Sequence, residues 1–262
     1  MKKHPLVVIL AAVLAVGTFV ATMSGWVSGA AKAALDLSNP YRAEYGGLTA
    51  LRVGVTPDYV ESSLGMAESV DPLCDVAMCP ADPDAAAETT VRVYRGDHSI
   101  VRAVFRGQDL AGYLVTTTAR DFTPRISWLG VDFGRLGRVT FDEVLPSNGA
   151  PEPSDASVFV GPGIPSYAEV LMGGGATRYE GFVLGSAPDG YGGPGLEWDA
   201  EAARVVEEWQ SDNADRGLDP DVAAAFRAGS MPNTFGAFQD DGPLSDYFRD
   251  AENVRVLLTA SP

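Results

Sequence analysis

The longest hydrophobic pattern lies at the start of the chain. Residues Pro5 to Ala31 contain no Asp, Glu, Lys or Arg, and an apolar run extends over Leu6–Val27. About twenty residues, at 1.5 Å each, span a hydrocarbon core of roughly 30 Å. A helix also satisfies its own backbone hydrogen bonds in lipid. The pattern therefore predicts a transmembrane helix at 6–27, between a cytoplasmic tail at 1–5 and a linker at 28–44.

The flanks of this segment indicate its orientation. Lys2 and Lys3 precede the apolar run, and basic residues favour the cytoplasmic side, so we expect the rest of the chain outside the cytoplasm. The alternative is a cleaved signal peptide, because Ala31-Lys32-Ala33 has the small-x-small form of a cleavage site. We favour a single-pass cell-membrane anchor, since the apolar stretch exceeds the core of an ordinary signal peptide.

Beyond the anchor, the patterns indicate short helices followed by strands. Val55–Val60 has the features of a helix start, with Thr56 as the N-cap and Pro57 at the first helical position. Strand patterns rich in β-branched and aromatic residues follow, at Thr89–Arg95, Ser99–Phe105 and Leu110–Thr117.

The same helix start recurs in the middle of the chain. Val139–Val144 repeats it, with Thr140 and Glu143 in a capping-box pattern. Strand patterns follow again, and Gly173–Gly175 is a turn signal. These later strands are expected at Ser157–Val160, Tyr167–Met172 and Thr177–Leu184.

We therefore predict an α+β fold with two tandem helix-plus-antiparallel-sheet units, at 45–123 and 124–195. A helical extension with a closing strand completes it at 196–262. Its helices are expected at Asp199–Gln210 and Asp219–Ala228, and its strand at Val254–Thr259. An antiparallel sheet can leave one face wet, so we expect solvent-side charges at Arg92, Arg95, Arg102 and Arg106.

The net charge of the chain after the predicted anchor limits the classes of molecule that it is expected to bind. All three lysines precede residue 33, and the other 16 basic residues, all arginine, stand against 35 Asp and Glu, which gives the exported part a net charge of −19. That field repels nucleic acid and anionic lipid, so we expect no nucleic-acid binding. It is compatible with a solvated surface, or with attraction of cations or of a basic partner.

Cys74 and Cys79 are the only cysteines. In an oxidising compartment we expect them to form a local disulfide. Two free, buried thiols are the alternative. A zinc site would need more ligands than this chain offers, because its only histidines are His4 and His98.

The remaining histidine gives a weak catalytic signal. His98 is adjacent to Ser99, and neighbours along a strand point to opposite faces, so a shared proton is disfavoured. We expect His98 in a turn or at a strand edge. Carboxylate pairs at Glu207-Glu208, Asp240-Asp241 and Asp82/Asp84 are common by number alone in so acidic a chain.

Two loop patterns resemble binding motifs only formally. Gly190–Gly195 matches G-x-G-x-x-G but lacks the strand–helix setting of a dinucleotide site. Asp212–Asp221 places Ala214 and Arg216 where a calcium loop needs ligands. We therefore predict no catalytic, cofactor or metal residues.

Several stretches resemble known envelope modules. Leu51–Gly65 resembles the helix-entry motif of the SmpA/OmlA-type outer-membrane assembly lipoproteins and of β-lactamase-inhibitor-like folds. Leu48–Gly65, Leu136–Val144, Tyr167–Gly192 and Pro232–Gly236, in this order, resemble an uncharacterised bacterial family of membrane-anchored proteins, the ETEC-type domain. The first resemblance implies short helices on a small antiparallel sheet that bind proteins and do no chemistry. The second implies an anchor and an extracytoplasmic domain with no established activity. Unlike those lipoproteins, this chain has no lipid-attachment cysteine.

The sequence therefore predicts a membrane-anchored extracytoplasmic protein that acts as a non-catalytic interaction module of the bacterial cell envelope. We expect an envelope protein as its partner, and an exposed aromatic patch at Tyr179, Phe182 and Tyr191 as the contact. The alternatives are an envelope hydrolase with a carboxylate-based site and an acidic, cation-binding structural domain. The sequence leaves the oligomeric state open.

Overall fold

The computed structural model describes residues 40–144, 156–159, 166–175, 178–191, 220–239 and 244–260. The chain divides into two compact units, residues 1–45 and 46–262. Helix α2 (Arg42–Leu48) crosses the boundary between the units. The predicted anchor lies outside the described residues. No helix within the described ranges combines the length and the apolar character that a membrane crossing requires.

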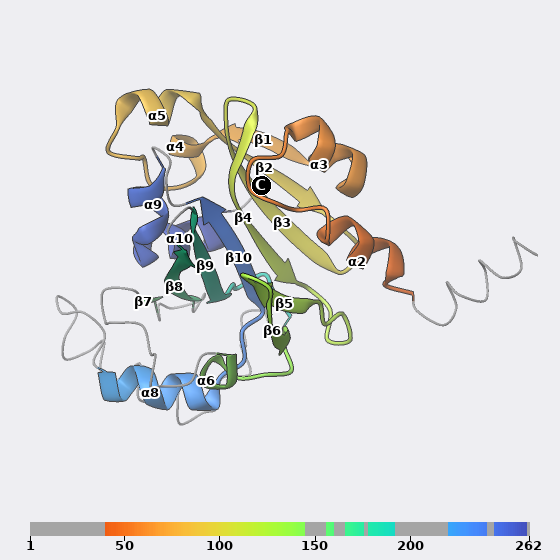
Figure 1. The fold of residues 1–262 in the computed structure, drawn as a ribbon, viewed down its shortest axis with the longest axis vertical. Helices are drawn as coiled ribbons and strands as arrows, with labels where there is room; N and C mark the ends of the chain where they lie inside the picture. The colour runs from red at the N-terminus through yellow and green to blue at the C-terminus, as the bar shows by residue number, and fades with distance from the viewer. Residues whose placement is uncertain are drawn as a thin grey trace, which may run out of the picture. The chain divides into compact units, whose positions relative to one another are not determined.

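The described part of the second unit is built on an eight-stranded sheet in which every neighbouring pair of strands is antiparallel (Figure 1). Its strand order is β1-β2-β3-β4-β10-β9-β8-β7. The bounds are β1 (Ser69–Pro72), β2 (Thr89–Arg95), β3 (Ser99–Arg106), β4 (Asp109–Thr117), β7 (Ala156–Phe159), β8 (Ser166–Gly175), β9 (Arg178–Ser186) and β10 (Thr234–Gln239).

A two-stranded hairpin and several short helices surround this sheet. The hairpin consists of β5 (Arg125–Trp128) and β6 (Val131–Arg135). The helices are α3 (Pro57–Leu64), α4 (Leu73–Val76), α5 (Pro83–Glu88), α6 (Phe141–Val144), α8 (Pro220–Gly229), α9 (Ser245–Arg249) and α10 (Ala251–Thr259).

The prediction of two tandem sheets is wrong, because β10 joins both halves into one sheet. β10 pairs with β4 along one edge and with β9 along the other. Strands from 45–123, from 124–195 and from 196–262 therefore share one hydrogen-bonded ladder. The physical reason is that two separate small sheets would leave the edges of β4 and β9 unpaired, and β10 satisfies both edges.

The predicted closing strand at Val254–Thr259 is also wrong, because these residues belong to helix α10. The Asp250 side chain accepts a hydrogen bond from the Glu252 backbone N–H at 2.9 Å and so caps the helix. Val254, Leu257 and Leu258 are buried, which is the i, i+3, i+4 spacing of a helix face. The β-branched composition of the segment concealed this period.

Helix starts and several strands are confirmed. The Thr56 side chain accepts from the Tyr59 N–H at 3.4 Å, and Thr140 and Glu143 bond each other's backbone N–H groups at 3.2 and 2.8 Å, as in a capping box. The bounds of β2 match the prediction. Gly173–Gly175, expected as a turn, instead ends β8. The predicted helix at Asp199–Gln210 lies outside the described residues.

Both faces of the sheet are covered. Helices α4, α5, α9 and α10 pack on one face, and α3, the β5–β6 hairpin, α6 and α8 pack on the other (Figure 1). Arg102 was predicted on a wet face, yet it is buried among α10 and the loop after β9. Its guanidinium donates to the Ala260 carbonyl at 3.1 Å and pairs with Asp189. A buried arginine needs such partners because its desolvation is costly.

The centre of the sheet is a close fit between an aromatic ring and two glycines. Phe238 of β10 lies opposite Gly112 of β4 and Gly181 of β9, and the Phe248 ring of α9 stacks on it at 5.0 Å between centroids. A Cβ atom at Gly181 would overlap the Phe238 ring, and one at Gly112 would press on Phe248 and Phe238. The two glycines thus make the space that this ring fills.

Gly181→Ala should therefore destabilise the fold. We expect the free energy of unfolding to fall by about 1–3 kcal/mol, because an extra methyl in a packed core forces its neighbours to shift. Urea unfolding followed by circular dichroism measures the change. Gly46→Ala in α2 is the control, because no heavy atom lies within 4 Å of its Cβ position. The control should be neutral or stabilising by up to about 1 kcal/mol, and equal effects at both sites would contradict the prediction.

Candidate functional site

Four exposed apolar side chains lie within the stretch that runs from α3 through β1 to the loop after α4. Tyr59 is 49% exposed, Met66 88%, Val70 52% and Met78 49%. β1 ends the strand order, and no other strand in the described ranges pairs with its outer side. These four side chains and the outer edge of β1 are called the β1-edge surface below. An open edge offers unpaired backbone N–H and C=O groups to another chain.

Local structure explains how these side chains come to the edge. Helix α3 carries Tyr59 and is capped at its C-terminal end by Gly65, which has a φ of 90°, a conformation that favours glycine. Met66 follows in the short link to β1, where alternation leaves Val70 exposed. Helix α4 follows β1 directly and packs on it.

The predicted disulfide is present beside this edge. The sulfur atoms of Cys74 and Cys79 lie at bonding distance, with 4.5 Å between the Cα atoms. The bridge closes the loop that carries Met78. It thereby restricts the segment that borders the β1-edge surface.

The β1-edge surface lies in the most one-sided charge environment of the sequence. Between Val53 and Val91 there are eight acidic residues and no Lys or Arg. Three of the eight form ion pairs with arginines of β2 and β3: Glu61 with Arg92 at 2.7 Å, Glu68 with Arg95 at 2.8 Å and Glu88 with Arg106 at 3.4 Å.

Asp71 lies within β1 itself and forms no ion pair with any residue that the structure describes. Its cross-strand neighbour is Val91, so β2 supplies no cation to it. Asp75, just beyond the strand, is exposed and likewise has no ion pair with any described residue. Carboxylates without a counterion beside an apolar surface favour a basic partner.

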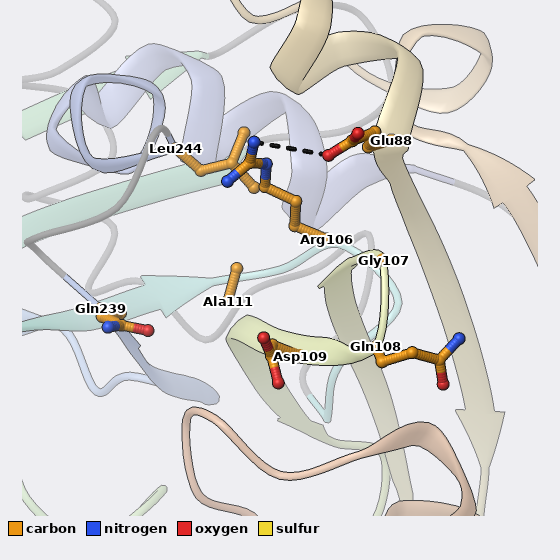
Figure 2. Close-up of a pocket in the computed structure, with 8 residues that line it drawn as sticks. All are labelled: Glu88, Arg106, Gly107, Gln108, Asp109, Ala111, Gln239 and Leu244. Atoms are coloured by element: carbon orange, nitrogen blue, oxygen red, sulfur yellow. Dashed lines mark ion pairs between the residues drawn. The ribbon is translucent and has the colours of Figure 1, made fainter.

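A pocket of about 450 Å³ lies at the end of the sheet where β3 turns into β4 (Figure 2). One of its lining residues, Ala111, forms a β-bulge in β4. Val104 pairs with Gly112 and Phe105 pairs with Leu110, so Ala111 has no paired residue on β3. The lining residues are Glu88, Arg106, Gly107, Gln108, Asp109, Ala111, Gln239 and Leu244.

The polar groups of this pocket are an ion pair, a further carboxylate and two amides. Arg106 Nη2 lies 3.4 Å from Glu88 Oε2, the contact drawn as a dashed line in Figure 2. Arg106 Nε is buried and has no hydrogen-bond partner in the part of the chain that the structure describes. The described lining contains no Ser, Cys, His or Tyr. These groups can bind a polar molecule, but they include no nucleophile paired with a base.

A buried ion pair fixes helix α8 to the sheet. Arg227 Nη1 donates to Glu169 Oε2 at 2.9 Å, and the Tyr167 hydroxyl donates to Glu169 Oε1 at 2.5 Å. Glu169 is 0% exposed and Arg227 is 1% exposed. The rings of Phe141, Tyr167 and Phe226 pack against one another around the cluster. Because the pair is enclosed, loss of one partner would leave a buried charge uncompensated.

Burial raises the pKa of Glu169 to about 7. Arg227 and the Tyr167 hydrogen bond act in the opposite direction, and Asp142 adds a small repulsion. Burial together with the Glu169 charge also raises the pKa of Tyr167 well above its ordinary value. A raised carboxyl pKa is typical of general acids, but Glu169 does not line the pocket and has no exposed surface.

The structure does not bring the predicted aromatic patch together on the surface. Phe182 is 1% exposed and lies in the core, where the rings of Trp128 and Phe133 stack on it at 5.4 and 6.1 Å between centroids. Phe182 therefore cannot belong to an exposed patch. The backbone of Tyr191 is held by the Asn233 amide, which donates to its carbonyl at 3.3 Å. The side chain of Tyr179 lies outside the described residues.

The other residues singled out in the sequence have structural contacts. His98 lies in the turn between β2 and β3, as predicted, and its ring stacks on Phe122 at 5.8 Å between centroids. Asp82 caps α5 by accepting from the Asp84 N–H at 3.0 Å. The pairs 207–208 and 240–241 lie outside the described residues. No three His, Cys, Asp or Glu side chains within the described ranges lie close enough together to hold a metal ion.

Sequence reasoning missed both the β1-edge surface and the buried ion pair. The absence of basic residues between Val53 and Val91 was a usable signal for the first. Nothing in sequence spacing links Glu169 to Arg227, which come together only through the packing of α8 on β8.

Comparison of the chain with protein-family models, curated proteins and solved structures gave no match.

The disulfide should contribute measurably to stability. Replacing both cysteines by serine, Cys74→Ser with Cys79→Ser, should lower the free energy of unfolding by about 2 kcal/mol, because a short covalent loop no longer restricts the unfolded chain. Urea unfolding with and without dithiothreitol measures this. The double variant should not respond to the reductant, and a native chain that is equally stable when reduced would contradict the prediction.

Glu169 should make stability depend on pH. Its folded-state pKa of about 7 exceeds the ordinary 4.5, so its contribution is fully present below pH 4.5 and is lost as the pH rises to about 7. The steepest loss is about 1.4 kcal/mol per pH unit. Glu169→Gln mimics the neutral form and should lack this component. Urea unfolding of both proteins at pH 5 and at about pH 7.5 compares them, and parallel pH profiles would contradict the assignment.

Proposed function

We propose that this protein is a membrane-anchored, extracytoplasmic interaction module of the cell envelope, without catalytic activity, and that it contacts a protein partner through the β1-edge surface. The observation that carries the proposal is an open sheet edge bordered by apolar side chains. Four of the eight large apolar side chains that the described residues expose belong to this one surface. Such concentration is typical of binding sites, whereas single exposed apolar residues are ordinary.

The compartment rests on the sequence and on the cysteines. The uncharged apolar stretch at 6–27 behind Lys2 and Lys3 supports an anchor with the remaining chain outside the cytoplasm. A disulfide between Cys74 and Cys79 fits an oxidising compartment. The two observations are independent of each other and agree.

The hydrolase alternative receives less support. A general acid must reach its substrate, and the carboxyl with the raised pKa, Glu169, is sealed between the sheet and α8. Its contacts with Arg227 and Tyr167 account for its burial as an element of the core. The pocket near Arg106 offers recognition of a polar molecule and lacks a paired nucleophile and base among its described residues.

A photo-crosslinking amino acid placed at position 70 in the full-length, membrane-embedded chain tests this function. We expect a discrete adduct from position 70, with the crosslink mapped by mass spectrometry to one segment of one partner. The matched control is position 131, because Val131 is also half exposed but lies on the β5–β6 hairpin.

A second variant links the adduct to the surface itself. Met66→Asp, in the link beside β1, should reduce the adduct from position 70, because it replaces an exposed apolar side chain with a charge. No adduct at position 70, or the same adducts from positions 70 and 131, would overturn the proposed function.

A further inference from the structure

We infer that the β1-edge surface binds an extended segment of a partner protein in which basic and apolar side chains alternate, and that this segment pairs with β1 as an added strand. The inference rests on the proposed function and specifies the chemistry of its partner. Strand addition at a free sheet edge supplies backbone hydrogen bonds, and alternate side chains then provide specificity.

The two sides of β1 present different chemistry to an added strand. Val70 pairs with Arg92 of β2 and so lies on the face covered by α3, while Asp71 pairs with Val91 and lies on the opposite face, toward α4. Side chains of a strand alternate between faces, so a strand added to β1 places every second residue beside Val70 and the others beside Asp71.

The face of Val70 selects apolar side chains. Val70 is half exposed, and the nearby charge of Arg92 is already neutralised by Glu61 at 2.7 Å. Met66, three residues before the start of β1, adds a flexible apolar side chain that can adapt to different partners. An apolar residue of the added strand would remove these side chains from water.

The face of Asp71 selects basic side chains. Asp71 has no cross-strand cation, and Asp75 is exposed on the helix that follows β1. With Glu61 and Glu68 neutralised by arginines of β2, these two acids carry the uncompensated charge nearest to the edge. Lys or Arg at alternate positions of the partner would complete the charge pairs.

The same charges argue against a second copy of this chain as the occupant. Two β1 edges would bring Asp71 and Asp75 of one copy close to the same two acids of the other, and β2 supplies no cation opposite Asp71. Like charges opposed across an interface are costly, so the surface excludes its own copies as well as acidic strands. Pro72 at the end of the four-residue strand further limits pairing to a short register.

The test uses the full-length chain in detergent micelles and three synthetic peptides of equal length. One alternates lysine with valine, the second alternates glutamate with valine, and the third is the lysine peptide with alternate N-methylated amides. We expect the lysine peptide to bind at least about tenfold more tightly than the glutamate peptide, since several exposed charge pairs add. Binding should weaken as salt rises from about 0.05 to about 0.5 M. N-methylation should weaken binding because it removes backbone donors.

Variants and hydrogen exchange locate the binding. Asp71→Asn with Asp75→Asn should reduce affinity for the lysine peptide several-fold, whereas Asp121→Asn, an exposed acid after β4, is the control and should leave it unchanged. Amide hydrogen exchange should slow at residues 69–71 when the lysine peptide is present. Equal binding of the lysine and glutamate peptides, or no protection at residues 69–71, would overturn the inference.

Two further outcomes separate this inference from the proposed function. A crosslink from position 70 combined with no binding of the lysine peptide would overturn the partner chemistry and leave the interaction function standing. Sedimentation that shows a dimer, dissociated by Val70→Asp, would also overturn the inference, because the occupant would then be a second copy.

Discussion

The fold depends on the two-sided pairing of β10. The strands β1 to β4 form one run in the sequence and β7 to β9 form another, and each run ends in a strand with one unpaired side. β10 bonds to β4 and to β9 at once, so the two runs become a single ladder. Helix α9 packs against both β8 and β10, so it covers this joint, while α4 packs on β1 and β2 and α10 on β7 to β9.

Local rules were sufficient for elements whose signals are contained within a few residues. The caps at Thr56 and Thr140 and the strand Thr89–Arg95 follow from hydrogen-bonding side chains and β-branched composition. The segments Thr234–Gln239 and Val254–Thr259 were assigned wrongly or not at all. The first is short and contains glycine, and its partners on β4 are distant in the sequence: Thr234 and Thr116 are 118 residues apart. The second has strand-like composition, while its burial follows the helical period.

The candidate surface illustrates a similar division. The disulfide and the acidic stretch are visible in the sequence, but the exposure of Val70 depends on which strand ends the sheet. The aromatic residues expected on the surface include Phe182, whose ring is needed in the core beneath Trp128. Aromatic composition alone cannot distinguish these two environments, because large rings contribute most of the contact area in cores and at interfaces alike. The ion pair of Glu169 and Arg227 could not be predicted from the sequence either, since it joins residues from separate elements.

The ring of Phe238 between two glycines has a consequence for how uniquely the sheet can assemble. A slip of β10 by one residue would turn this ring to the opposite face, toward Phe182. A slip by two would keep the ring on the same face but move it away from Gly112 and Gly181, so that it would face residues with side chains instead of the two glycines. Neither alternative alignment can accommodate the ring at the same depth. The packing of this ring therefore selects a single register of β10 against β4 and β9, and only in that register do the two halves form one sheet.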